Sequence, residues 1–193
     1  ITPGLVNASL APPGEANTRP VGATVTDLAG NTSPVANDSA TLDTVATAPT
    51  VAITEDANND GLISFAEYAG PTIEVQVSLP GDTVAGDTVT VTDGITPQNI
   101  VLTATDITNG FVNASLASPG EGNTLTVSAT VTDLAGNTST VANDSATLDT
   151  VATAPTVAIT EDANNDGLIS FAEYAGPTIE LQVSLPGDTV AAE

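Results

Sequence analysis

The sequence has 193 residues, of which 24 are Asp or Glu and only one, Arg19, is basic, so its formal net charge is −23. This charge excludes nucleic-acid binding, which needs Lys and Arg to replace the counterions of the phosphates. The absence of Cys and His excludes thiol and imidazole catalysis, disulfides and the usual zinc or copper sites. Because 40% of the residues are hydrophobic, we expect a folded acidic protein, with oxygen ligands that suit calcium, magnesium or manganese.

One internal repeat governs the organisation of the chain. Pro49 recurs as Pro155 and Glu55 as Glu161, each 106 residues later, and about 11 of the 87 overlapping positions differ. Near-identity over this length indicates tandem duplication within a longer array, and the period is that of a whole domain. The segment 42–49, LDTVATAP, and its copy 148–155 are the predicted seams, because proline interrupts sheet pairing.

The seams divide the chain into three predicted parts. Residues 1–48 are the C-terminal part of one repeat, 49–154 are a complete repeat, and 155–193 are the N-terminal part of the next. No apolar segment reaches the roughly 18 to 20 residues of a membrane-spanning helix, so we expect a soluble piece without membrane insertion, any export signal lying elsewhere.

The complete repeat has the periodicity of β-strands. In 72–79, TIEVQVSL, apolar and polar residues alternate, as in a half-buried strand. The other predicted strands are rich in Thr and Val and are separated by turn sequences such as Pro80-Gly81 and Asp93-Gly94; they are 50–54, 88–92, 99–104, 110–116, 124–132 and 138–148. About seven short strands in about 100 residues predict an all-β fold, an immunoglobulin-like β-sandwich.

A calcium-binding loop is the most specific motif. Residues 56–67 read DANNDGLISFAE, and residues 162–173 repeat them. Every ligand position of an EF-hand loop is filled, with Asp at 1, Asn at 3, Asp at 5, Gly at 6, a carbonyl donor at 7 and Glu at 12. The predicted Ca²⁺ ligands are Asp56, Asn58, Asp60, Leu62 and Glu67, and in the copy Asp162, Asn164, Asp166, Leu168 and Glu173.

The sequences around this loop differ from those of an EF-hand. A strand-like TVAIT precedes it and Pro71 soon follows, so at most about one helical turn fits after it. We therefore expect a calcium loop between strands rather than a paired EF-hand that opens a groove. The alternative interpretation is a polar surface loop in which Asp, Asn and Gly only make turns.

A second, weaker constellation of carboxylates lies near the seams. Asp133 and its copy Asp27 open the turn sequence Asp-Leu-Ala-Gly-Asn, while Asp149 and its copy Asp43 lie in the seams themselves. If turn and seam share one end of the sandwich, these four Asp residues could hold calcium at the junction between repeats. An Asn-rich turn beside a solvated linker is the alternative.

The combination of LDTVATAPTVAITEDANNDGLIS, VTDLAGNTS and a repeat of 106 residues resembles the bacterial immunoglobulin-like extender repeats of giant repeats-in-toxin (RTX) adhesins, and is similar to the stalk repeats of an ice-binding adhesin. The resemblance implies type I secretion to the bacterial cell surface, where calcium folds the repeats and stiffens their linkers. It also implies that the loop residues named above are calcium ligands and that Asp27, Asp43, Asp133 and Asp149 are junction candidates.

Three functions follow in order of preference. The first is a non-enzymatic, calcium-rigidified spacer that projects a terminal binding domain for adhesion or biofilm formation, with calcium ions and neighbouring repeats as its partners. The second is an immunoglobulin-like module that itself binds a glycan or protein, for which few aromatic residues are present. The third, a two-carboxylate glycosidase, is disfavoured because no large domain or aromatic cleft is expected, and we expect no small-molecule substrate.

Overall fold

The computed structural model describes residues 4–174 and 176–187, so the ends of the first and last predicted repeats lie partly outside the described residues. The chain is mostly β, with one short helix and four small sheets in the described part. Its elements, in order, are β1 (Thr18–Ala23), β2 (Ala36–Thr41), β3 (Thr50–Ile53), β4 (Leu62–Ser64), β5 (Thr72–Ser78), β6 (Thr88–Thr92), β7 (Gln98–Val101), α1 (Ala104–Asn109), β8 (Phe111–Ala117), β9 (Thr124–Thr132), β10 (Ala142–Asp149), β11 (Thr156–Ile159) and β12 (Leu181–Ser184).

Strands β3 to β10 form a two-sheet sandwich, called here the central sandwich. One sheet has the order β4-β10-β9-β6-β7 and the other the order β3-β5-β8. Residues alternate between buried and exposed along β5, β8 and β9, so each strand turns one face to a shared core of Val, Ile, Leu and Ala. Ile73, Val75, Val77, Val89 and Val91 are fully buried in it.

The chain passes from one sheet of the central sandwich to the other between β3 and β4. β3 pairs antiparallel with β5, whereas β4 pairs in parallel with β10 through Leu62↔Thr147 and Ile63↔Leu148. The segment between them, which contains the first half of the predicted calcium loop, therefore passes from one sheet to the other. β4 was not among the predicted strands, because its partner lies more than 80 residues away and no local alternation marks it.

The second difference from the sequence expectation is helix α1. The predicted strand 99–104 ends at Val101, where β7 stops, and α1 follows. Thr103 caps the helix by accepting a hydrogen bond from the Asp106 N–H, and the Asp106 carboxylate accepts one from the Thr103 N–H in return. Gly110 ends the helix at φ 78°, a left-handed conformation that favours glycine.

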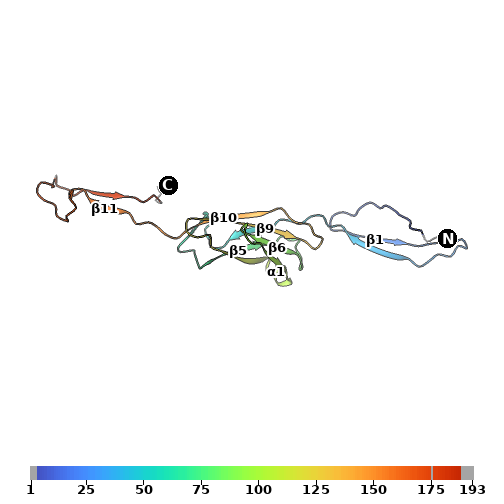
Figure 1. The fold of residues 1–193 in the computed structure, drawn as a ribbon. Coiled ribbons are helices and arrows are strands. Elements are labelled where there is room, and N and C mark those ends of the chain that lie inside the picture. The colour runs from blue at the N-terminus through green and yellow to red at the C-terminus, as the bar shows by residue number, and fades with distance from the viewer. Residues whose placement is uncertain (1–3, 175, 188–193) are drawn as a thin grey trace.

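Two hairpins flank the central sandwich at opposite ends (Figure 1). In the β1–β2 hairpin, Thr18 pairs with Thr41, which is the same register as the pairing of Thr124 with Thr147 in β9–β10. The β11–β12 hairpin has the same register as β3–β5. Local pairing thus forms in both flanking parts without a second sheet to cover it.

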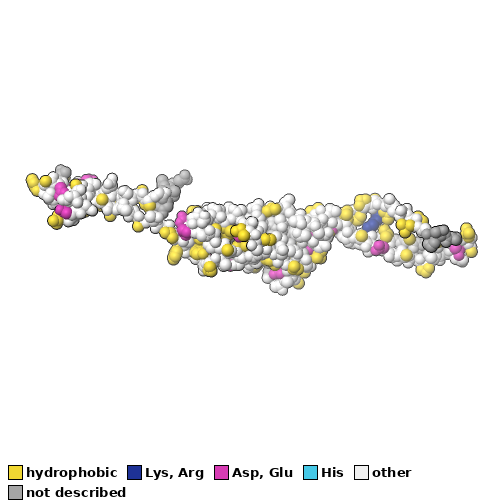
Figure 2. Space-filling model, viewed as in Figure 1, with side chains coloured by type: hydrophobic (Ala, Val, Ile, Leu, Met, Phe, Trp, Pro, Cys, Tyr) yellow, Lys and Arg dark blue, Asp and Glu magenta, His cyan; other side chains and the backbone are white. Residues whose placement is uncertain are grey.

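Acidic side chains lie on all three parts, and the single basic one lies on the N-terminal part (Figure 2). No helix within residues 4–174 and 176–187 has the length and apolar character to cross a membrane.

Candidate metal site

The predicted calcium loop makes its tight turn between β3 and β4. Asn59 and Gly61 adopt left-handed conformations, with φ of 57° and 83°. Glycine is the residue that reaches this conformation without strain, and Asn tolerates it better than most others do. The two residues reverse the chain so that Asp56, Asn58 and Asp60 share one side of the turn through their mutual hydrogen bonds.

The Asp56 carboxylate stabilises this turn by accepting hydrogen bonds from its backbone N–H groups. Its Oδ1 accepts a hydrogen bond from the Asp60 N–H (3.0 Å) and its Oδ2 one from the Gly61 N–H (2.9 Å). Asn58 Nδ2 donates to Asp60 Oδ2 (2.8 Å), and Asp60 Oδ1 accepts from the Leu62 N–H (2.9 Å). Because Asp56 is only 6% exposed, these bonds keep a buried carboxylate satisfied and hold the backbone in a closed loop.

The back of the loop is fixed to the core by Ile63. This side chain is fully buried and belongs to the same cluster as Ile53 and Leu148. In addition, the Gly61 carbonyl accepts a hydrogen bond from the Thr147 N–H at 2.9 Å. The loop is therefore attached to β10, the strand that leads out of the central sandwich into the seam 148–155.

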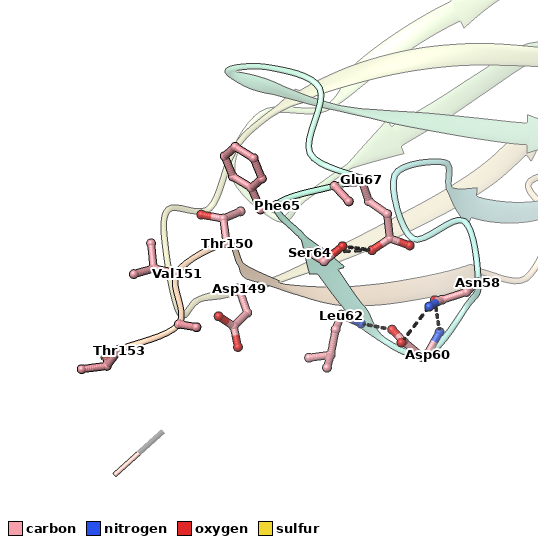
Figure 3. Close-up of a pocket in the computed structure, with 12 residues that line it drawn as sticks. Asn58, Asp60, Leu62, Ser64, Phe65, Glu67, Asp149, Thr150, Val151 and Thr153 are labelled. Atoms are coloured by element: carbon pink, nitrogen blue, oxygen red, sulfur yellow. Dashed lines mark hydrogen bonds between the residues drawn. The ribbon is translucent and has the colours of Figure 1, made fainter. Parts of the chain in front are cut away.

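Glu67, the predicted closing ligand, is turned toward Ser64 rather than toward Asp60 (Figure 3). Its Oε2 accepts hydrogen bonds from Ser64 Oγ (2.7 Å) and from the Ser64 N–H (3.0 Å). Within the described ranges, no three carboxylates converge closely enough to hold a metal ion. The donor set of carboxylates, one amide and one carbonyl is of the type that binds Ca²⁺. The loop would have to rearrange for Glu67 to reach an ion held by Asp56 and Asp60.

The contact with Ser64 gives a test of this geometry. The hydroxyl and N–H of Ser64 lower the pKa of Glu67 below its ordinary value of 4.5, and Ser170 does the same for Glu173. In calcium-free protein, Ser64→Ala is expected to raise the pKa of Glu67 toward its ordinary value and to leave that of Glu173 low. Carboxyl-carbon NMR titration measures both in one sample. Equal pKa values for the two Glu residues in the variant would contradict the contact.

The sign of the pH dependence follows from the same contact. A lowered pKa in the folded state favours folding above the ordinary value and loses this contribution as the pH falls through the folded-state pKa. The stabilisation by Ser64 is therefore present at neutral pH and disappears only in acid.

The second copy of the loop keeps the same internal hydrogen bonds outside the central sandwich. Asp162 accepts hydrogen bonds from the N–H groups of Asp166 (3.0 Å) and Gly167 (2.9 Å), and Ser170 Oγ donates to Glu173 (2.6 Å). Asn164 Nδ2 donates to Asp166, and Leu168 lies at the position of Leu62. The turn is thus a property of the local sequence. The described residues of this segment form no strand equivalent to β4, because no equivalent of β10 lies beside them.

A cavity of about 600 Å³ separates the loop 56–67 from the seam that follows β10 (Figure 3). Asn58, Asp60 and Glu67 line one side, and Asp149 with residues 150–153 lines the other. The predicted junction residue Asp149 thus lies at the loop end of the central sandwich, where it pairs with Ser64 in the β4–β10 ladder.

Glu121 fixes the start of this seam, a role that the sequence analysis missed. Its carboxylate accepts hydrogen bonds from the Thr150 N–H (2.9 Å), from Thr150 Oγ1 (2.7 Å) and from the Val151 N–H (3.2 Å). The hydroxyl of Thr150 is the main cause that lowers the pKa of Glu121. Glu15 makes the equivalent contacts with Thr44 in the other seam. In both repeats the Glu precedes the Thr by 29 residues, and this repeated spacing is the sequence feature that could have predicted the contact.

At the opposite end of the central sandwich, the structure brings Asp43 and Asp133 together. Asn137 Nδ2 bridges them, donating to Asp133 Oδ2 at 2.8 Å and to the Asp43 carbonyl at 3.1 Å. Thr47 Oγ1 in the same seam donates to Asp82 at 2.6 Å. A cavity of about 310 Å³ lies here, and its acidic lining residues are Glu15, Asp43, Asp82, Asp87 and Asp133.

The four junction candidates do not form one group. Asp27 lies in the turn of the β1–β2 hairpin, where it accepts hydrogen bonds from the N–H and the amide of Asn31, and Asp149 lies at the loop end. A seam residue such as Asp43 meets the turn of the following repeat, here Asp133, rather than the turn of its own repeat. Asp27 and Asp149 thus lie apart from Asp43 and Asp133 and from each other.

Comparison with known proteins assigns no family. No protein-family model and no curated protein matches the chain. Among solved structures, the chicken interferon gamma receptor alpha chain is 14% identical with a TM-score of 0.38, covering 70% of this chain and 68% of the receptor chain. A 1.5-MDa bacterial ice-binding adhesin, studied for host cell surface retention, is 26% identical with a TM-score of 0.38, covering 77% of this chain. The match spans about half, 47%, of that adhesin chain.

Proposed function

We propose that this chain is a calcium-rigidified extracellular spacer built from tandem immunoglobulin-like domains, part of the stalk of a bacterial adhesin exported by type I secretion. The observation that carries the proposal is the position of the loop 56–67. The loop follows β3, which pairs with β5 in one sheet, and it contains β4, which pairs with β10 in the other sheet. An ion held there would link both sheets to the strand that leads to the next repeat.

The charge of the chain supports a partnership with cations. The chain has no Lys, so its 24 carboxylates have a single possible basic partner, Arg19. Repulsion between like charges favours extended over compact states, and bound Ca²⁺ would reduce it. Extracellular calcium-binding modules work with dissociation constants of roughly 0.1 to 1 mM, which suits a protein that folds fully only after export.

The geometry of the seams supports the role of a spacer. The two seams leave the central sandwich at opposite ends (Figure 1), and each is held at its start by a Glu that accepts hydrogen bonds from the seam backbone, Glu15 at Thr44 and Glu121 at Thr150. Repeats joined in this way extend in a line, and each adds about 40 Å if roughly ten residues of strand are counted at 3.3 Å together with loops and linker.

Small-angle X-ray scattering tests this function directly. In 2 to 5 mM calcium, a range chosen to lie above the dissociation constants of extracellular modules, the maximum dimension of the chain is expected to be sharply defined. Excess EGTA should broaden the distance distribution, because the seams then lose their restraint. Magnesium at the same concentration is the matched control and should not replace calcium. Identical scattering curves in calcium and in EGTA would refute a calcium-rigidified spacer.

A further inference from the structure

The turn 133–137 of the central sandwich binds the seam 42–49 through the side chain of Asn137. The Asn137 N–H donates to Asp133 Oδ1 and its Nδ2 donates to Asp133 Oδ2, both at 2.8 Å. Nδ2 also donates to the main-chain carbonyl of Asp43 at 3.1 Å. One amide therefore closes the turn of its own repeat and contacts the seam that arrives from the preceding repeat.

The copy of this turn, residues 27–31, shows that the two contacts are separable. The N–H and Nδ2 of Asn31 donate to Asp27 at 2.8 and 2.9 Å, so this turn is closed in the same way. The described residues give the Asn31 amide no second acceptor, and Asn31 is exposed whereas Asn137 is half-buried. Closing the turn thus needs only the local sequence, and the contact with Asp43 is additional to it.

The end of the seam is held by a second hydrogen bond. Thr47 Oγ1 donates to Asp82 Oδ2 at 2.6 Å, and Pro49, two residues later, is buried in the central sandwich. At Thr44, the seam is held by the repeat that it leaves, because the Glu15 carboxylate accepts hydrogen bonds from the Thr44 N–H and hydroxyl. The seam is therefore bound by both of the repeats that it joins.

The two groups that bind the seam from the central sandwich are fixed relative to each other by Asp87. This carboxylate is only 2% exposed. Its Oδ2 accepts a hydrogen bond from the Val84 N–H (2.8 Å), and its Oδ1 accepts one from the Leu134 N–H (3.2 Å). The loop 79–87, which contains Asp82, is thus joined to the turn that contains Asn137, and both belong to one rigid surface.

We propose that the turn 133–137 and the loop 79–87 form a docking site for the seam of the preceding repeat, in which Asn137 positions the seam without a metal ion. The proposal rests on the proposed spacer function and deepens it, because it names the residues that align successive repeats. Calcium in the loop 56–67 would restrain a seam against the repeat that it leaves, whereas this site holds the seam against the repeat that it enters.

An amide is required at position 137 because its partners are acceptors. The Asp133 carboxylate and the Asp43 carbonyl both need a donor, and an Asn side chain supplies two N–H groups. An ionised Asp has the same shape but supplies none. Asn137→Asp is therefore expected to release the seam while changing the size of the side chain very little.

Nuclear magnetic resonance in EGTA tests the site in the absence of calcium. In the wild-type chain, a scalar coupling across the hydrogen bond from Asn137 Nδ2 to the Asp43 carbonyl carbon is expected. Backbone ¹⁵N relaxation should give residues 43–47 order parameters of about 0.85, as in a rigid backbone, and Asn137→Asp should lower them below about 0.6.

Two further variants separate docking of the seam from closure of the turn. Thr47→Val removes the hydrogen bond to Asp82 without touching the turn, and it should lower the order parameters of the seam around residue 47. Asn31→Asp removes the same turn-closing amide from the copy. It should lower the order parameters of residues 27–31 and leave those of residues 43–47 unchanged, so it measures the effect of an open turn alone.

The outcomes distinguish this proposal from the calcium-rigidified spacer. A seam that is mobile in EGTA and is ordered by calcium equally in wild type and in Asn137→Asp overturns the docking site and leaves the spacer function standing. A seam as ordered in Asn137→Asp and Thr47→Val as in wild type also overturns it. A seam that is ordered in EGTA and loosened by both variants supports the docking site, even if scattering shows no effect of calcium.

Discussion

If the loop 56–67 binds calcium as proposed, replacing Asp56 by Ala is expected to abolish the rise in the melting temperature of the central sandwich on addition of calcium. In the wild-type chain, calcium at 100 times its dissociation constant adds about 2.7 kcal/mol to the free energy of unfolding for each independent site. For a domain of about 100 residues, this corresponds to a rise of about 10 °C or more in melting temperature. Asp56 is the first ligand of the proposed site and accepts hydrogen bonds from the Asp60 and Gly61 N–H groups, so its removal would disrupt both the proposed site and the turn.

Tyrosine fluorescence can follow the unfolding of the central sandwich alone in this experiment. The chain has no Trp and only two Tyr residues. Tyr68 packs against the core of the central sandwich, whereas Tyr174 lies outside it and is 50% exposed. In a Tyr174→Phe background, the thermal transition reported by Tyr68 is measured in calcium and in EGTA, with and without Asp56→Ala.

The second loop provides a matched control. Asp162→Ala removes the same ligand from an identical sequence outside the central sandwich. It should leave the calcium dependence of the Tyr68 transition unchanged while lowering the number of calcium ions bound, as measured by isothermal titration. If Asp56→Ala melts with an undiminished calcium response, the loop 56–67 is a turn and not a calcium site.

The strands that could be predicted from the sequence are those in which local pattern and burial coincide. The alternation in 72–79 matches β5, whose Ile73, Val75 and Val77 are all buried. The pattern of 99–104 predicts one strand, whereas the structure has α1 after Thr103; Thr103 and Asp106 are its capping residues and Gly110 is its terminal glycine. β4 could not be predicted, because only the distant strand β10 gives it pairing partners.

For the candidate site, the sequence predicts a local turn. Asp56, Asn58 and Asp60 are joined by hydrogen bonds in one turn, because the turn is local, while their role as ligands stays a prediction. The sequence predicts Asp43 beside a turn only if turn and seam share one end of the sandwich; in the structure, Asp43 lies beside Asp133, in the turn of the following repeat. Which turn a seam meets depends on the direction in which the chain leaves the sandwich, and sequence spacing carries no information about that direction. The metal itself stays a prediction.

Replacing Ile63 by Ala should separate the contribution of the core from that of the ion. Ile63 is fully buried, so the cavity left by the substitution is expected to lower the free energy of unfolding of the central sandwich by about 2 to 5 kcal/mol. Because Ile63 also holds the loop against β10, calcium affinity should fall as well. Asp56→Ala, by contrast, should lower calcium affinity at a smaller cost in EGTA.

Ile169→Ala is the control that the repeat offers. It makes the same change in the same local sequence, but Ile169 is 36% exposed and lies outside the central sandwich. Its effect on the free energy of unfolding of the central sandwich is expected to be about 0.5 kcal/mol or less. Urea unfolding in EGTA, followed by Tyr68 fluorescence, measures both variants. Equal losses from the two substitutions would contradict the assignment of Ile63 as the residue that anchors the loop to the core of the central sandwich.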